Sequence, residues 1–175
     1  MFRFQPHTGE LTLQPSEEAE RVAAALTEAD KRAHVKSAVE VRKAAKARIL
    51  QAGGDATSEL LIASESQLQF GKYRGQTFRW LLSNAVGYAC IILASHQKER
   101  EGDSSQTPLM VHKDLLLHYA RQFTKMVAAI RARGVQEGFI PQRANDEELV
   151  TLQGYRGKGI TFAVMYESTD KELKG

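Results

Sequence analysis

The chain has 175 residues, of which 42% are hydrophobic and 26% are charged. These values are close to those of folded proteins, which excludes wholesale disorder, and the length suits one domain or a small domain with long helical attachments. The net charge of +3 is too small to indicate a nucleic-acid partner by itself. The charge is unevenly distributed, since residues 16–30 hold five acids and one base whereas residues 31–48 hold seven bases and one acid. Such a dipolar segment is typical of an interaction surface.

The first 15 residues predict an extended arm, because their apolar side chains alternate around a turn. Ser16 then suits a helix N-cap, and acids follow it in the first turn, where the helix dipole favours them. No Gly or Pro interrupts the chain before Gly53. We therefore predict one long charged helix over residues 16–52.

In a continuous helix, six cations of this segment share one face about 140° wide. These cations are Lys31, Arg32, Lys36, Arg42, Lys43 and Lys46. The opposite face is rich in alanine, which permits close packing but buries little area. A basic face of this kind could follow a phosphate backbone with salt-dependent, sequence-independent affinity, and its spacing loosely resembles a bipartite nuclear-import signal. The alternative is a solvated helix face, which is the commoner meaning of a charge run.

The most specific pattern in the chain is Phe70-Gly-Lys-Tyr-Arg-Gly75, which is followed at once by Thr77-Phe-Arg-Trp-Leu-Leu82. The two glycines permit positive φ angles and predict the tight turn of a hairpin. Lys72 and Arg74 would project to one side of this turn as a phosphate-facing tip. In the alternative interpretation the turn is solvated and Tyr73 packs on the core.

This pattern resembles the short module found at the C-terminus of exodeoxyribonuclease X and in related proteins. The resemblance covers residues 68–94. The matching positions are Phe70, Gly71, Lys72, Tyr73, Arg74, Gly75, Thr77 and Tyr88. It implies a hairpin followed by two helices and an accessory role, because the nuclease chemistry of such proteins lies in another domain. The apolar run over residues 85–94 suits a helix or a strand, and its place directly after Phe78–Leu82 favours a helix. The chain departs from the module at Asn84, where an acid is usual, at Gly87, and at Ile91, where the module often has Trp.

A second long helix is expected over residues 109–133, closed by Gly134, because apolar residues recur there at helical spacing. Further on, Gly154–Phe162 repeats part of the glycine-bracketed pattern. This repeat indicates a C-terminal hairpin or short sheet and a degenerate second copy of the motif within residues 145–175. The predicted fold class is therefore α+β and helix-dominated, with residues 65–134 forming the hairpin–helix module and the second long helix.

Patterns that indicate catalysis are weak. The five histidines never form a His-x-x-x-His pair, and the single cysteine, Cys90, lies in an apolar run that predicts burial. One cysteine also forms no intramolecular disulfide and no cysteine-based zinc cluster. We expect no enzyme, no metal and no cofactor.

Residues 1–14 lack the apolar core of a signal peptide, and no run reaches the ~18 residues of a membrane-spanning helix. We therefore expect an intracellular protein, nuclear or cytoplasmic, with no membrane partner.

The leading functional hypothesis is a non-catalytic, nucleic-acid-associated accessory protein. It would bind DNA or RNA phosphates through the basic helix face together with Lys72 and Arg74. The competing hypothesis is a protein-interaction or self-association module that uses the alanine-rich face and the helix over residues 109–133. A third, weaker hypothesis is a fragment of a catalytic subunit whose remaining residues lie elsewhere.

Overall fold

The computed structural model describes residues 1–142 and has eight helices there. The chain divides into two units, Met1–Phe139 and Ile140–Gly175, and the fold described here is that of the first. The helices are α1 Glu17–Ala25, α2 Glu28–Lys31, α3 Ala38–Gln51, α4 Glu59–Ser64, α5 Phe78–Asn84, α6 Val86–Arg100, α7 Pro108–Ala120 and α8 Thr124–Gln136. Within residues 1–142 the only β pairings are two isolated bridges, Phe4 with Leu11 and Gln67 with Thr77. The predicted α+β class is therefore wrong for the described residues, which are helical.

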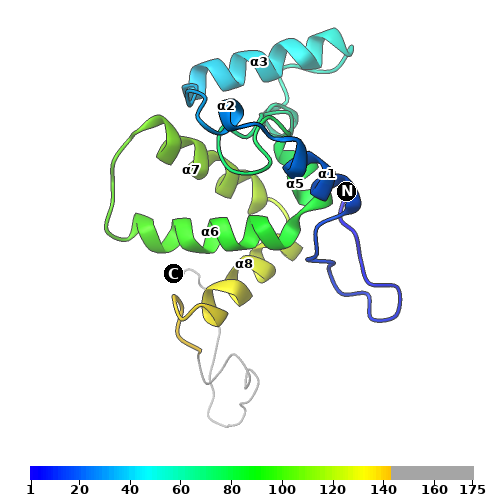
Figure 1. The fold of residues 1–175 in the computed structure, drawn as a ribbon, viewed down its shortest axis with the longest axis vertical. Coiled ribbons are helices and arrows are strands. Elements are labelled where there is room, and N and C mark those ends of the chain that lie inside the picture. Colours follow the sequence, from blue (N-terminus) through cyan, green and yellow to red (C-terminus); the bar gives the residue numbers. More distant parts are fainter. Residues whose placement is uncertain (143–175) are drawn as a thin grey trace. The chain divides into compact units, whose positions relative to one another are not determined.

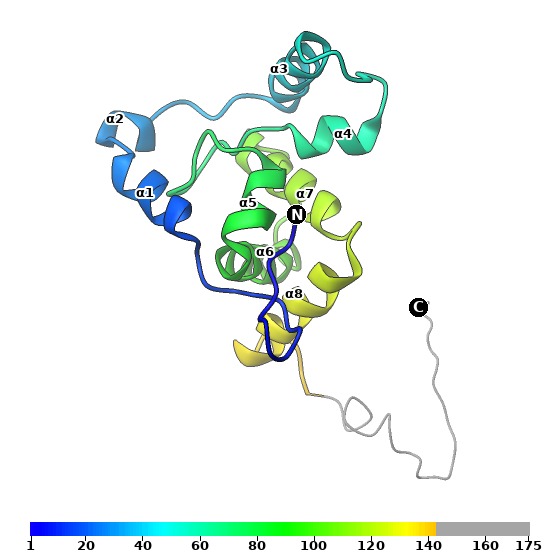
Figure 2. The same ribbon diagram turned by 90° about the vertical axis from the view of Figure 1, so that its right-hand side faces the viewer.

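Helix α6 forms the centre of the unit. Its residues Val86, Ala89 and Leu93 are completely buried, and α5, α7 and α8 pack around it (Figure 1). The predicted helix over residues 85–94 is confirmed, and so is the burial of Cys90, which raises the pKa of that thiol to about 11. Helix α3 lies at the far end of the unit from α8 and packs on α4 (Figures 1 and 2). The main core is therefore built from residues that follow position 60.

The predicted long helix over residues 16–52 is wrong, because the segment forms three helices. Thr27 caps α2 and Ser37 caps α3, and each makes a capping box with the acid three residues on, Asp30 or Glu40. These reciprocal hydrogen bonds satisfy the free N–H groups of a new helix end, so they favour a fresh start over continuation. Ser16 caps α1 as predicted.

The predicted second long helix is also interrupted, at residues 121–123. No Gly or Pro lies there. Instead the Phe123 ring packs edge-on against Phe2, at 5.6 Å between ring centroids, and against Tyr119, at 5.3 Å. The contact with Phe2 joins this break to the N-terminal arm, whereas residues four apart, such as Tyr119 and Phe123, are neighbours in a continuous helix as well. Helix α8 then runs past Gly134, which is buried inside it, and Gly138, with φ of +80°, follows its end.

The glycine-bracketed segment is a closed loop rather than a hairpin of two strands. The Gly75 N–H donates to the Leu68 carbonyl at 2.9 Å and the Leu68 N–H donates to the Gln76 carbonyl at 2.8 Å. The pairing is limited to one bridge, Gln67 with Thr77, between the end of α4 at Ser64 and the start of α5 at Phe78. Both loop glycines have positive φ, as predicted.

Tyr88 of α6 holds this loop in place. Its hydroxyl accepts a hydrogen bond from the Lys72 N–H and lies where a Cβ at position 71 would be. Tyr73 is buried, with its ring 4.9 Å from that of Tyr88 and 5.4 Å from that of Trp80. The prediction that Tyr73 packs on the core is confirmed.

The N-terminal arm crosses the corner where the chain turns from α5 into α6. The Arg3 side chain donates to the carbonyls of Ser83 and Asn84, at 2.8 and 3.1 Å, which are among the free carbonyls at the end of α5. The Gly87 N–H donates to the Leu13 carbonyl at 2.9 Å, and a side chain at position 87 would collide with that oxygen. Two departures from the resembled module, Asn84 and Gly87, therefore contact the arm.

Candidate binding surface

The structure disperses the cations that the sequence placed on one helix face. Lys31 and Arg32 both pair with Glu28 at the end of α2, and Lys36 lies in the connection between α2 and α3. Only the remaining three share a helix. These are Arg42, Lys43 and Lys46 on α3.

The two motif cations are also engaged. The Arg74 guanidinium donates to the His34 carbonyl at 2.6 Å, and the backbone of Lys36 donates to the Gln69 side chain at 3.1 Å. These bonds hold the α2–α3 connection against the glycine-bracketed loop. The Lys72 ammonium lies 5.5 Å and 5.4 Å from the ring centroids of Tyr73 and Tyr88, within the range of a cation–π contact.

Helix α3 carries an exposed stripe of mixed character. Val39 is 76% exposed and Leu50 is 64% exposed, and both lie on the same side of the helix as Lys43. The alanine-rich inner side is already used within the chain, since Ala45 and Ile49 are buried against α4. That inner side is therefore not the free docking face that the sequence suggested.

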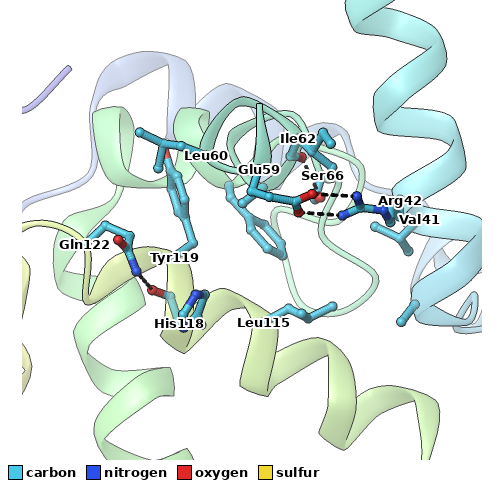
Figure 3. Close-up of a pocket in the computed structure, with 13 residues that line it drawn as sticks. Val41, Arg42, Glu59, Leu60, Ile62, Ser66, Leu115, His118, Tyr119 and Gln122 are labelled. Atoms are coloured by element: carbon cyan, nitrogen blue, oxygen red, sulfur yellow. Dashed lines mark hydrogen bonds and ion pairs between the residues drawn. The ribbon is translucent and has the colours of Figure 1, made fainter. Parts of the chain in front are cut away.

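An open groove of about 370 Å³ lies between α3, α4 and α7 (Figure 3). Its lining is mostly apolar, and the deeply buried lining residues Ile62, Phe78 and Tyr119 belong to α4, α5 and α7. The volume is about two and a half times the ~150 Å³ of a cavity that encloses a benzene ring. The groove is therefore large enough for more than one apolar side chain.

Two leucines of the groove are exposed, although Ile62, Phe78 and Tyr119 of the same lining are buried. Leu60 of α4 is 51% exposed and Leu115 of α7 is 40% exposed. Exposed leucines are ordinary when they are scattered, but an apolar groove edged by leucines indicates an interaction site. His118 and Gln122 add polar groups to the lining, and the Gln122 amide donates to the His118 carbonyl at 3.1 Å (Figure 3).

An ion pair at the edge of the groove joins α3 to α4. The Arg42 guanidinium donates to both oxygens of Glu59, at 2.7 and 2.8 Å (Figure 3). The hydrogen bond from Arg42 lowers the pKa of Glu59, and the charge of Lys46 lowers it further. Glu59 therefore meets the charges of Arg42 in the lining and of Lys46 beside it, so cations outnumber acids among the described residues at this edge of the groove.

His112 lies in the core, away from any open surface. It is 1% exposed, and its Nε2 accepts a hydrogen bond from the Gln69 N–H at 3.1 Å. Burial lowers its pKa to about 4, so the ring is neutral at pH 7. A neutral ring between Phe70 and Phe78 stabilises the loop that carries Gln69.

His96, Arg100 and Asp114 form a polar network between α6 and α7. The Arg100 guanidinium donates to both carboxylate oxygens of Asp114, at 3.0 and 2.7 Å, and His96 lies 2.7 Å from the same carboxylate. Arg100 also donates to the carbonyls of Asp103 and Ser105. The network therefore fastens the loop that joins the two helices.

Comparison with protein-family models, with curated proteins and with solved structures gave no match. The resemblance to the exodeoxyribonuclease X module therefore stays a prediction. Within residues 1–142, no group of three or more His, Cys, Asp or Glu side chains has the arrangement of a metal site.

No single helix in this part of the chain has the length and apolar character needed to cross a membrane. Helices α5 and α6 meet those criteria only as a pair, and the chain bends by 118° between them.

The groove residues were not identified from the sequence. Leu60 and Leu115 occur in apolar runs, Glu59-Leu-Leu-Ile62 and Leu115-Leu-Leu117, in which period and composition do not distinguish the exposed leucine from its buried neighbours. The Arg42–Glu59 pair joins residues seventeen positions apart on different helices. No local sequence signal identifies such a contact.

Proposed function

We propose that the protein is a non-catalytic protein-interaction module whose docking face is the groove between α3, α4 and α7 with the adjoining exposed side of α3. The observation that carries this proposal is the open apolar groove edged by Leu60 and Leu115. Val39 and Leu50 extend the apolar surface along α3. An apolar groove between helices is a common receptor for a partner's apolar side chains.

The charge pattern supports this interpretation over phosphate binding as the main role. Lys31, Arg32 and Arg42 are in ion pairs with acids, and Arg74 is bonded to a carbonyl. A backbone phosphate would have to compete with each of these contacts. The exposed Val39 and Leu50 of α3, in contrast, stabilise a complex only when they contact another apolar surface.

A photo-reactive benzoylphenylalanine at position 60 of the full chain, expressed in its native cells, tests the proposal. We expect a discrete protein adduct, because this position lies in the groove, and we expect its loss on Leu115→Glu. The matched control places the same residue at position 127 on α8, where valine is similarly exposed, at 46%. Identical adducts from both positions, or adducts that survive Leu115→Glu, would contradict the docking face.

Nucleic-acid binding is the second candidate, favoured by the exposed lysines of α3 and its preceding connection. Lys36, Lys43 and Lys46 make no side-chain ion pair or hydrogen bond within the described residues. On duplex DNA, three phosphate contacts give a slope of log affinity against log salt of about −3, whereas all eight predicted cations would give about −7. A fluorescence-anisotropy titration of a DNA duplex at several salt concentrations measures this slope.

Neutralising these three lysines should then abolish most of the salt dependence. Binding that is unchanged in the triple variant would remove the nucleic-acid candidate. An intracellular setting, nuclear or cytoplasmic, is part of both proposals, and the basic residues between positions 31 and 48 support a nuclear one.

A further inference from the structure

We propose that the occupant of the groove is an acidic amphipathic helix of a partner protein, whose apolar side chains enter between Leu60 and Leu115 and whose acids meet Arg42 and Lys46. This inference rests on the proposed function and adds the chemistry of the partner.

The shape of the site favours a helix. The groove is lined by the sides of helices, and its two exposed leucines, Leu60 and Leu115, belong to different helices, α4 and α7. An extended peptide would gain main-chain hydrogen bonds from an open strand edge, and residues 1–142 contain no strand. A helix satisfies its own backbone and presents apolar side chains at i, i+3 and i+4, which suits a groove of about 370 Å³.

The charge of the site favours an acidic helix. Arg42 is paired with Glu59, but Lys46 lies one helical turn further along α3, its charge also acts on Glu59, and it makes no ion pair with any described residue. Arg42 in the lining and Lys46 beside it therefore set two cations against one acid at this edge of the groove. A partner carboxylate placed here would meet a positive potential, whereas a partner lysine would be repelled.

The ion pair does not close the groove to such a partner. The Arg42 and Glu59 side chains are 47% and 73% exposed, so the pair lies in solvent at the edge. Exposed pairs contribute little to stability, so Arg42 can exchange Glu59 for a partner acid. The apolar floor of Phe78 and Tyr119 stays in place, because both residues belong to the main core.

Selection from a library of 16-residue helical peptides displayed on phage, with the full-length protein as bait, tests the inference. We expect the enriched peptides to combine apolar residues at i and i+3 or i+4 with a net negative charge. The affinity of the fluorescein-labelled enriched peptides, measured by fluorescence anisotropy, should fall at least tenfold with Leu60→Glu or Leu115→Glu. It should be unchanged with the control Val127→Glu on α8, and circular dichroism shows whether each variant is folded.

Two lysines of α3 provide a variant and a matched control that test the predicted preference for an acidic peptide. Lys46→Glu should weaken binding of the enriched peptides roughly fivefold, the size of a partly exposed charge pair. Lys43→Glu should weaken it less than twofold, because position 43 is turned about 100° around the helix from Arg42, whereas position 46 is turned only about 40°.

The outcomes separate this inference from the proposed function. Two outcomes would overturn the acidic helix and leave the docking face intact. In the first, the enriched peptides depend on Leu60 and Leu115 but carry no excess of acids. In the second, the two lysine variants weaken their binding equally. If no peptide is enriched, or if the enriched peptides bind both leucine variants as tightly as the native protein, the inference and the docking face are both overturned. A doubled molar mass in light scattering that Leu115→Glu abolishes would assign the groove to a second copy of the chain and also overturn it.

Discussion

Replacing Gly71 by alanine tests whether the contact between the glycine-bracketed loop and Tyr88 determines the motif. Gly71 has φ of +78°, and a Cβ there would overlap the Tyr88 hydroxyl. The left-handed conformation costs an alanine roughly 1–2 kcal/mol. Overpacking against a side chain held in the core adds roughly 1–3 kcal/mol. We therefore expect Gly71→Ala to lower the free energy of unfolding by about 3 kcal/mol.

Gly75 in the same loop supplies the matched control. Its φ is +91°, but no atom lies within 4 Å of the position that a Cβ would take. Gly75→Ala should therefore show the backbone cost alone, roughly 1–2 kcal/mol. Urea denaturation followed by circular dichroism measures both variants, with the slope checked for two-state behaviour.

Tyr88→Phe then separates the overlap from the backbone cost. The phenylalanine removes the hydroxyl and leaves the nearest ring carbon at 3.4 Å from the new Cβ, which is an ordinary contact. Alone, the substitution loses the hydrogen bond from Lys72, at about 1 kcal/mol. In the Tyr88→Phe background, Gly71→Ala should cost no more than Gly75→Ala, a coupling of roughly 1–3 kcal/mol. Additive effects, or equal costs for the two glycines in the native background, would refute this reasoning.

Three further predictions concern the caps and the core. Arg3→Ala should destabilise the fold by about 2 kcal/mol, because the carbonyls of Ser83 and Asn84 lose a charged donor; limited proteolysis should then cut residues 1–15 faster, and unchanged cleavage would contradict the arm contact. Ser37→Ala should cost about 1 kcal/mol in urea denaturation through loss of the α3 N-cap, whereas Ser104→Ala, in an exposed loop, should cost almost nothing. For His112, the pKa of about 4 in the folded state is below the ordinary 6.5, so the unfolded chain binds the proton more readily. The contribution of His112 to the free energy of unfolding should be complete above pH 6.5 and decrease as the pH drops towards 4, by up to the order of 3 kcal/mol. His112→Gln should flatten this pH profile. An equal decline in the variant would assign the decline to other groups.

Local chemistry made several features predictable. Ser16 followed by acids marks the start of α1, and the paired glycines of the motif give the two positive φ angles of its loop. The apolar run around Cys90 marks the central helix. Each of these features depends on groups within a few residues of one another, so spacing in the sequence carries the information.

Over residues 16–52 the absence of Gly and Pro predicts a continuous helix, yet Thr27-x-x-Asp30 and Ser37-x-x-Glu40 in the same stretch are capping-box signals for two new helix starts. The hairpin predicted at the motif is a closed loop whose pairing is one bridge, Gln67 with Thr77. The proposed second copy within residues 145–175 lies outside the described residues.

The sequence by itself determined the start of α1 and the turn glycines of the motif, because those depend on short-range hydrogen bonds and backbone sterics. Only the tertiary structure decided which cations remain available. Arg42 donates hydrogen bonds to Glu59 and Arg74 donates one to the His34 carbonyl, and both contacts join distant positions. The groove exists for the same reason, since α3, α4 and α7 meet around an apolar floor without filling it. Its binding surface is therefore a property of packing, which residue order along one helix does not encode.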